Sequence, residues 1–427
     1  MPVKKGVKRS RAATTGGSGG KRPKLIVSSP GVTRTKEAGI VLTFGQGDVG
    51  QLGLGEDIME RMRPALVPVL KDIVDVCAGG MHTTCLSSSG EVITFGCNDE
   101  GGLGRETSEE GSEFKPGKVE LVGKAIQITA GDSHSAVLLD DGRVFAWGSF
   151  RDSVGAMGLT LNGIEKSPVE ILPGFTVVKI ASGSDHLVML TNEGQLFTCG
   201  CGEQGQLGRI PERGANRKAR QGLTHLLKPE VVKFKPRLKP VFEDVWAGSY
   251  CTFAKERLNG QIYVFGLNNH NQLGFKNDGE QSMYFQPVIS QPLSEKKVIK
   301  VCVGQHHTIV LDNEGLLYSL GRKEYGRLGL GELCPDAEAP VLIPALKDKK
   351  CVDIACGTSV SFAVTDKGEA FSWGMGTSGQ LGTGDEADVY EPHLIGGKQL
   401  ENRKVVQVSA GGQHTVLLAT NSEGNSS

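Results

Sequence analysis

A short element that ends in Gly-Gln-Leu-Gly recurs along the chain and restricts the fold more than any other feature. Each copy places a glycine after an apolar stretch, then four residues, then Gly-Gln-Leu-Gly or a variant of it. Seven copies begin about 52 residues apart, with one longer interval, at Gly45, Gly96, Gly148, Gly200, Gly266, Gly321 and Gly374. Repeats of this length are typical of solenoids and propellers, in which each repeat is one supersecondary unit.

A second element, small residue-Gly-x-x-His or a variant, precedes every copy except the first. Its seventh instance, 410–414, has no Gly-Gln-Leu-Gly after it, so the C-terminal segment supplies what the first repeat lacks. A closed ring completes one blade from both ends of the chain and leaves no open sheet edge. We therefore predict an all-β, seven-bladed propeller over 37–420, closed by pairing of its N- and C-terminal segments, with 421–427 as a flexible C-terminus.

Two signals predict the strands within a repeat: apolar residues at every second position, and turn residues between the strands. In the third repeat they predict strands from Ala125 to Thr129, His134 to Leu139 and Arg143 to Trp147, with a hairpin at Asp140-Asp141-Gly142. Successive strands run in opposite directions. The Gly-x-x-His turns and the Gly-Gln-Leu-Gly loops are therefore expected on one face of the ring, called the loop face below.

Composition excludes several classes of protein. Sixty glycines are about twice the usual share, but 38% hydrophobic residues and 47 basic against 48 acidic residues describe a folding chain. No apolar run reaches the roughly 18 residues of a membrane span, and none follows the basic N-terminus. We expect a soluble intracellular protein without a membrane partner, whose ten scattered cysteines are reduced.

Residues 1–36 form a basic tail that contains ten Lys and Arg residues and no acidic one. Few of its residues can bury apolar surface, so the tail is expected to be disordered. Its two clusters look like a bipartite nuclear import signal, and the same charges can neutralise DNA phosphates. The residues assigned to DNA or an import receptor are Lys4, Lys5, Lys8, Arg9, Lys21, Arg22 and Lys24.

From about Ile40 to Ala419 the chain resembles the family of the regulator of chromosome condensation, the guanine nucleotide exchange factor for the Ran GTPase. The resemblance rests on GQGDVGQLGLGE, GCNDEGGLGR, GSFRDS, GCGEQGQLGR, GQHHT and GKQLENR. It implies a propeller whose loop face binds Ran, with one loop, the wedge, pressed against the nucleotide-binding region. Exchange of this kind needs no covalent chemistry and no cofactor.

The resemblance also implies the GTPase-binding residues. The wedge corresponds to Ser149 to Gly158, which carries two extra residues, and its expected working residues are Phe150, Arg151 and Asp152. The other implied contacts are Asp48, Asp132, Asp185, Arg209 and His306. An alternative for Asp48 and Asp132 is that they only cap their turns, because Asp often bonds to nearby backbone in turns.

The recurring histidines of the Gly-x-x-His turns have two interpretations. A ring of histidines is reminiscent of a metal site, but Cys251 and Val360 interrupt the series. We therefore expect buried, hydrogen-bonded structural histidines and no metal. His306 differs, because alternation points it away from the structural residue His307.

A long insertion follows the fourth Gly-Gln-Leu-Gly. Residues 209–240 contain ten basic and two acidic residues, in a body that is otherwise strongly acidic. The insertion is either a solvated excursion or, as the resemblance implies, a loop that docks on the acidic patch of the histone dimer. Arginine suits that task because its planar fork matches carboxylates, and the candidates are Arg213, Arg217 and Arg220.

The resemblance, together with the basic tail, thus implies a nuclear, chromatin-associated exchange factor that binds Ran, histones and DNA. Such a protein generates Ran-GTP at chromosomes for nuclear transport, spindle assembly and nuclear envelope formation. The main alternative is a chromatin-docking propeller scaffold without exchange activity. A propeller module of a ubiquitin ligase and a tryptophan-based light sensor are less favoured, the latter because the chain has only three Trp residues.

Overall fold

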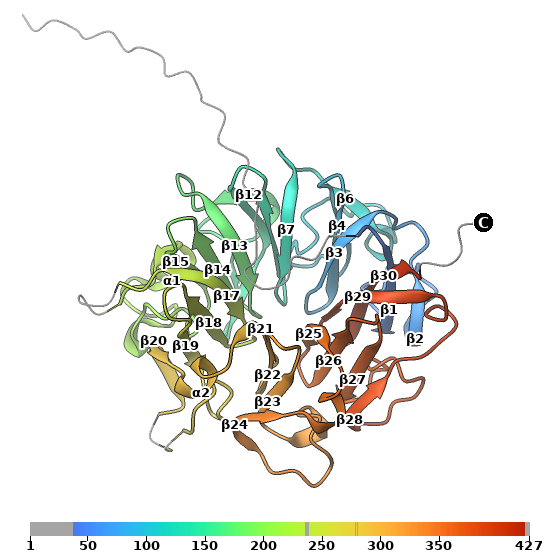
Figure 1. Ribbon diagram of the computed structural model, residues 1–427. Coiled ribbons are helices and arrows are strands. Elements are labelled where there is room, and N and C mark those ends of the chain that lie inside the picture. Colours follow the sequence, from blue (N-terminus) through green and yellow to red (C-terminus); the bar gives the residue numbers. More distant parts are fainter. Residues whose placement is uncertain (1–36, 235–238, 278, 280, 423–427) are drawn as a thin grey trace, which may run out of the picture.

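A computed structural model describes residues 37–234, 239–277, 279 and 281–422. In these residues the chain forms seven four-stranded antiparallel sheets arranged as blades around an axis (Figure 1). This arrangement confirms the predicted seven-bladed propeller. The predicted features of residues 1–36, and the predicted C-terminal segment from residue 423 onward, lie outside the described part of the chain.

The first blade is built from both ends of the described chain. Its strands are β1 (Ile40–Gln46), β2 (Glu60–Leu66), β29 (Arg403–Ala410) and β30 (His414–Asn421), in the order β2-β1-β30-β29. Leu42 pairs with Leu417 and Gly45 with His414, and Figure 1 shows blue β1 beside red β30. The predicted closure is therefore confirmed, and β30 extends one residue beyond the predicted boundary at 420.

The other six blades follow in chain order. Blade 2 contains β3 (Ile73–Ala78), β4 (His82–Ser87), β5 (Val92–Gly96) and β6 (Gly117–Val119); blade 3 contains β7 (Ala125–Ala130), β8 (His134–Leu139), β9 (Val144–Gly148) and β12 (Glu165–Ile171); and blade 4 contains β13 (Val177–Ser182), β14 (His186–Thr191), β15 (Leu196–Gly200) and β16 (Glu230–Val231). The predicted strands of the third repeat agree with β7, β8 and β9 to within one residue at either end.

Blades 5 to 7 repeat the same order of strands. Blade 5 contains β17 (Phe242–Ala247), β18 (Cys251–Glu256), β19 (Ile262–Leu267) and β20 (Met283–Ile289); blade 6 contains β21 (Val298–Val303), β22 (His307–Asp312), β23 (Leu317–Gly321) and β24 (Ala337–Leu342); and blade 7 contains β25 (Cys351–Cys356), β26 (Val360–Thr365), β27 (Ala370–Gly374) and β28 (Val389–Leu394). Two short helices, α1 (Gly222–Leu227) and α2 (Gln291–Ser294), lie in connections.

The hydrophobic core lies between neighbouring blades. In β8 all six residues are buried, because each face of a central strand packs on an adjacent blade. One cluster joins Leu86 and Val92 of blade 2 to Val137 and Trp147 of blade 3. The last glycine of a Gly-Gln-Leu-Gly loop closes such a contact: Gly104 has φ of +65°, and a Cβ there would lie 2.7 Å from the ring of Trp147.

Five buried histidines link one blade to the next. Each Nε2 lies 2.8–3.0 Å from a hydroxyl of the following blade, in the pairs His82–Ser135, His134–Ser182, His186–Thr252, His307–Ser361 and His414–Thr83. The last pair crosses the closure of the ring. Burial lowers the pKa of the His82 ring to about 4 and that of the other four to about 3. The histidines are neutral and structural, as the sequence predicted.

Candidate partner-binding face

The loop face is held together by one backbone hydrogen bond in each blade. In every repeat, the first loop residue after the opening glycine donates its N–H to a carbonyl of the Gly-x-x-His turn. The seven bonds measure 2.7–3.1 Å and join Gln46 to Gln413, Cys97 to Met81, Ser149 to Ser133, Cys201 to Asp185, Leu267 to Tyr250, Arg322 to His306 and Met375 to Ser359. The turns and loops therefore share one face, which confirms the prediction made from strand direction.

Three of the implied GTPase contacts are carboxylates of this face. Asp48 and Asp132 are exposed, and Asp48 also accepts a hydrogen bond of 3.1 Å from Nε2 of Gln51 within its own loop. Asp185 is half-buried, and its Oδ1 accepts the backbone N–H of Arg151 at 2.7 Å. Burial, together with the charge of Asp132, raises the pKa of the Asp185 carboxyl to about 7.

The expected wedge is a two-stranded hairpin of β10 (Phe150–Asp152) and β11 (Gly155–Gly158). Carboxylates from neighbouring loops hold it. Arg151 pairs with Glu100 of blade 2, and Glu203 of blade 4 accepts the N–H and the hydroxyl of Ser153 at 3.0 and 2.7 Å. The hairpin is therefore ordered by contacts within this chain alone.

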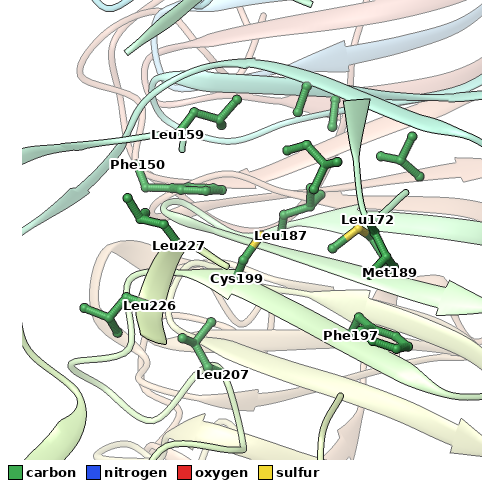
Figure 2. Close-up of a cluster of buried hydrophobic side chains, with 14 of the residues drawn as sticks. Phe150, Leu159, Leu172, Leu187, Met189, Phe197, Cys199, Leu207, Leu226 and Leu227 are labelled. Carbon is green, nitrogen blue, oxygen red and sulfur yellow. The ribbon is translucent and has the colours of Figure 1, made fainter. Parts of the chain in front are cut away.

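The three expected working residues of the hairpin point in different directions. Phe150 is fully buried and lies in the cluster of Figure 2 with Leu159 and Leu227. Its ring packs at a tilt against that of His134, with centroids 4.6 Å apart. Its side chain is thus not presented to a partner in this structure, and it anchors the hairpin. Arg151 is exposed. The hairpin tip also exposes Val154 (63%), which the sequence analysis did not single out.

Asp152 is bound to the long insertion. Arg217 donates from Nε to Oδ2 of Asp152 at 2.6 Å, and its Nη2 bonds to Oδ1 of the same carboxylate and to the carbonyl of Gly155 at 2.8 Å. The Asp152 side chain is only 1% exposed. The structure therefore joins one expected histone-binding residue to one expected GTPase-binding residue, while Arg213 and Arg220 remain exposed.

Arg209 is buried by the insertion that follows it, with 2% of its side chain exposed. Its guanidinium donates to the carbonyls of Thr198 (3.2 Å) and His225 (2.8 Å) and lies 3.4 Å from a carboxylate oxygen of Glu230. Arg105, at the equivalent position of blade 2, donates to backbone carbonyls in the same way. Arg209 thus binds the insertion to β15 and is not presented to a partner here.

His306 lies on the loop face and is half-buried, whereas His307 is fully buried. The facing predicted from alternation is correct. The His306 ring packs against that of His270, with centroids 5.0 Å apart. Burial and the nearby His270, Arg327 and Arg322 side chains lower the pKa of His306 to about 4, so the ring is neutral near pH 7.

Metal-binding clusters and membrane-spanning helices are absent from the described part of the chain. Across these residues, no group of three or more His, Cys, Asp and Glu side chains is arranged to hold a metal ion. Within the same ranges, no helix is long and apolar enough to span a bilayer. The predicted DNA and import residues, Lys4 to Lys24, fall outside the described ranges.

Comparison with known proteins gives consistent matches. Residues 40–417 match the model of the RCC1-like domain. The regulator of chromosome condensation of Xenopus laevis is 54% identical over 425 residues, which cover 98% of this chain and 99% of the relative. The exchange factor SRM1 of Saccharomyces cerevisiae is 29% identical, with 88% of this chain and 86% of the relative covered.

Two solved yeast structures have the same fold. The crystal structure of Prp20p from Saccharomyces cerevisiae, described with its binding properties to Gsp1p and histones, aligns with a TM-score of 0.80 and 28% identity over 90% of this chain and 92% of that one. Yeast RCC1 (Prp20) bound to Kap60 aligns with a TM-score of 0.83 and 27% identity over 97% of both chains.

Proposed function

This chain belongs to the RCC1-like domain family, and from that premise we propose that it is a guanine nucleotide exchange factor for the Ran GTPase. The observation that carries the proposal is the hairpin of β10 and β11, which is fixed on the loop face among Glu100, Asp185 and Glu203. A rigid projection beside an acidic face suits a basic partner that must be both bound and distorted.

The mechanism is a difference in affinity. The loop face binds the nucleotide-free conformation of the GTPase more tightly than the nucleotide-bound one, so nucleotide and propeller weaken each other's binding. GDP and GTP are both released faster, and cellular nucleotide levels set the direction of exchange. The protein accelerates dissociation and forms no covalent intermediate.

The exposed residues of the face have separate roles in this proposal. Asp48 and Asp132 attract basic side chains, and the exposed Arg151 with the tip of the hairpin acts on the nucleotide-binding region. Asp185 holds the hairpin through the Arg151 N–H and offers its other oxygen to a cation. His306 makes a neutral contact. Phe150, Asp152 and Arg209 act indirectly, because they fix the hairpin and the insertion.

Chromatin docking is the second part of the proposal. We infer that Arg213 and Arg220, which are exposed on the insertion, donate to the acidic patch of the histone dimer. The basic tail binds DNA and an import receptor, which makes the protein nuclear. The yeast relative Prp20p is described with its binding properties to histones and in a structure bound to Kap60, which supports a histone contact and a partner like Kap60 for this chain.

Release of a fluorescent GDP analogue from purified Ran tests the function. We expect release to accelerate with catalytic amounts of the protein and with excess GDP or GTP alike. The control is the same titration with a variant in which Asp132 and Asp185 are both replaced by Asn. Release at the spontaneous rate with micromolar wild-type protein would leave only the alternative, a chromatin-docking scaffold.

A further inference from the structure

Arg327 of the sixth loop occupies a position that other repeats give to glutamine. The equivalent residues are Gln51, Gln206, Gln272 and Gln380, and all four are buried. In each of these loops the glutamine Oε1 accepts the backbone N–H two residues before it, at 2.7–3.0 Å. In four blades, therefore, the neutral amide of a glutamine closes the loop with a hydrogen bond, and no cation occupies that position.

Arginine has no acceptor, so the sixth loop is built differently. Its Nε donates to the carbonyl of Glu324 at 2.8 Å, and Tyr325 takes a left-handed conformation with φ of +60°. Side chains with a Cβ adopt that conformation at a cost. The sixth loop thus contains a strained residue and lacks a closing bond of the kind seen in the other four.

The guanidinium of Arg327 is buried without an ion-pair partner among the described residues, although Asp336 attracts it at longer range. The residue is 2% exposed, and its Nη1 has no hydrogen-bond partner among the described residues. None of the carboxylates in the described ranges forms an ion pair with it. The neighbouring Asp336 instead accepts the N–H of Lys323 at 2.9 Å. A buried cation without a partner is strongly disfavoured in a folded protein.

A second buried nitrogen without a hydrogen-bond partner among the residues described belongs to His306, whose side chain is near Arg327. Nδ1 of His306 is also buried and has no partner within the described chain. Burial and the charge of Arg322 lower the pKa of Arg327 to about 10, which leaves it charged near pH 7. The centroid of the exposed Tyr325 ring lies 5.5 Å from Cζ of this guanidinium.

We propose that Arg327 and His306 form a binding recess for one carboxylate, supplied by an Asp or Glu side chain of the protein that binds the loop face. A carboxylate complements a planar guanidinium with two parallel hydrogen bonds and satisfies the free Nη1. The identity of the occupant rests on the proposed function, because that function makes the GTPase the partner on this face.

The recess itself is tested on the free protein with acetate as the probe. Arginine is labelled with nitrogen-15, and the guanidinium signals are followed during titration with sodium acetate at constant ionic strength. We expect acetate to shift one buried signal in the wild type and in Lys323→Gln, whose exposed cation lies in the same loop. That shift should be absent from Arg327→Gln. Failure of acetate to move any buried signal would overturn the recess, whatever the exchange assay shows.

The occupant is tested by Ran binding and GDP release. Arg327→Gln restores the residue of four other loops, so we expect an unchanged or higher melting temperature together with at least a tenfold loss of affinity for nucleotide-free Ran. Alanine replacement of the Asp or Glu of Ran that fills the recess should weaken binding to the wild-type propeller. The same replacement should cause no further loss of affinity for Arg327→Gln. A drop of several degrees in melting temperature, or full affinity in Arg327→Gln, would refute the assignment. If wild-type protein fails to release GDP, the proposed function fails, and the acetate titration still decides the recess.

Discussion

Arg217 and Asp152 form a two-point ion pair that ties the basic insertion to the hairpin of β10 and β11. The pair lies between the segment expected to dock on histones and the segment expected to act on the GTPase. An Arg217 that anchors on a histone carboxylate must first leave Asp152, whose side chain is nearly fully buried. The pair therefore holds Arg217 at the hairpin and leaves the exposed Arg213 and Arg220 as candidates for the proposed histone contact.

Replacing Arg217 by alanine should loosen the hairpin. The change leaves the Asp152 carboxylate without its partner, which we expect to cost about 1 to 2 kcal/mol, because Arg217 itself is partly solvated. GDP release from isolated Ran should slow severalfold, and amide exchange at the hairpin should speed up. Arg213→Ala is the matched control on the same insertion and should leave both unchanged. Full exchange activity in Arg217→Ala would show that the pair does not position the hairpin.

Arg213 and Arg220 should matter for nucleosomes and hardly for naked DNA. Forked contacts to clustered carboxylates depend on geometry, whereas phosphate contacts depend mainly on charge. The double alanine variant is expected to lose at least tenfold in affinity for nucleosomes, with partial rescue by lysine at both sites. Affinity is compared on nucleosomes with intact and neutralised acidic-patch carboxylates. Equal binding of wild-type protein to the two would remove the histone contact and leave the insertion as a solvated excursion.

Alanine substitutions at His306 and His307 should have different effects, the first on GDP release and the second on stability. His307 is buried and bonded to Ser361, so His307→Ala loses a hydrogen bond and leaves a cavity, at a cost of about 2 to 4 kcal/mol in unfolding free energy. His306→Ala should melt close to the wild type yet release GDP more slowly. Thermal unfolding and GDP release are measured on both variants. The reverse pattern would mean that the side chains face opposite to their positions in the structure.

The regular parts of this fold could be predicted because each repeat marks the same turns. Glycines and the Gly-x-x-His turns identify every blade, and alternation was enough to place His306 outside and His307 inside. The hairpin was less predictable. Its register shifts between Phe150 and Arg151, so alternation does not carry through it, and Phe150 turns inward.

The insertion shows a second limit of sequence reasoning. The resemblance implied that Arg209 contacts the GTPase and made Arg217 a candidate for histone binding. In the structure Arg209 donates to carbonyls of helix α1, and Arg217 binds Asp152. These contacts join residues 16 to 65 positions apart and depend on how an irregular segment folds back. The burial of Arg209 had one available signal, since Arg105 follows the equivalent loop of blade 2 in the same way.

Asp185 should make partner binding depend on pH. Its carboxyl has a pKa raised to about 7 and faces Asp132 and Glu100 as well as Arg151. The group ionises as the pH rises through 7, and only the ionised form attracts a cation of the partner. Affinity for nucleotide-free Ran should therefore increase between pH 6 and pH 8. Asp185→Asn should bind more weakly at pH 8 and should lack this step, whereas an unchanged pH profile in the variant would exclude Asp185 as its source.

The five inter-blade histidines should make the propeller sensitive to acid. Their pKa values in the folded state are about 3 to 4, against about 6.5 in the unfolded chain, so unfolding takes up protons below pH 6.5. Their stabilisation is complete above pH 6.5 and is lost as the pH falls towards 4. Asp185 has the opposite effect, because its raised pKa makes it bind a proton in the folded state that is released on unfolding. It reduces the proton uptake on unfolding by at most one.

Together, the five inter-blade histidines and Asp185 therefore account for a net uptake close to four protons near pH 5. His306, whose pKa is also about 4, adds close to one more, and each proton is worth about 1.4 kcal/mol per pH unit. Urea unfolding at pH 7.0, 6.0 and 5.0 measures the slope of unfolding free energy against pH. His307→Val, which copies Val360 of blade 7, should lower stability at pH 7 and reduce the slope by about one proton. A slope equal to that of the wild type would show that the His307 ring titrates normally and is not held neutral between the blades.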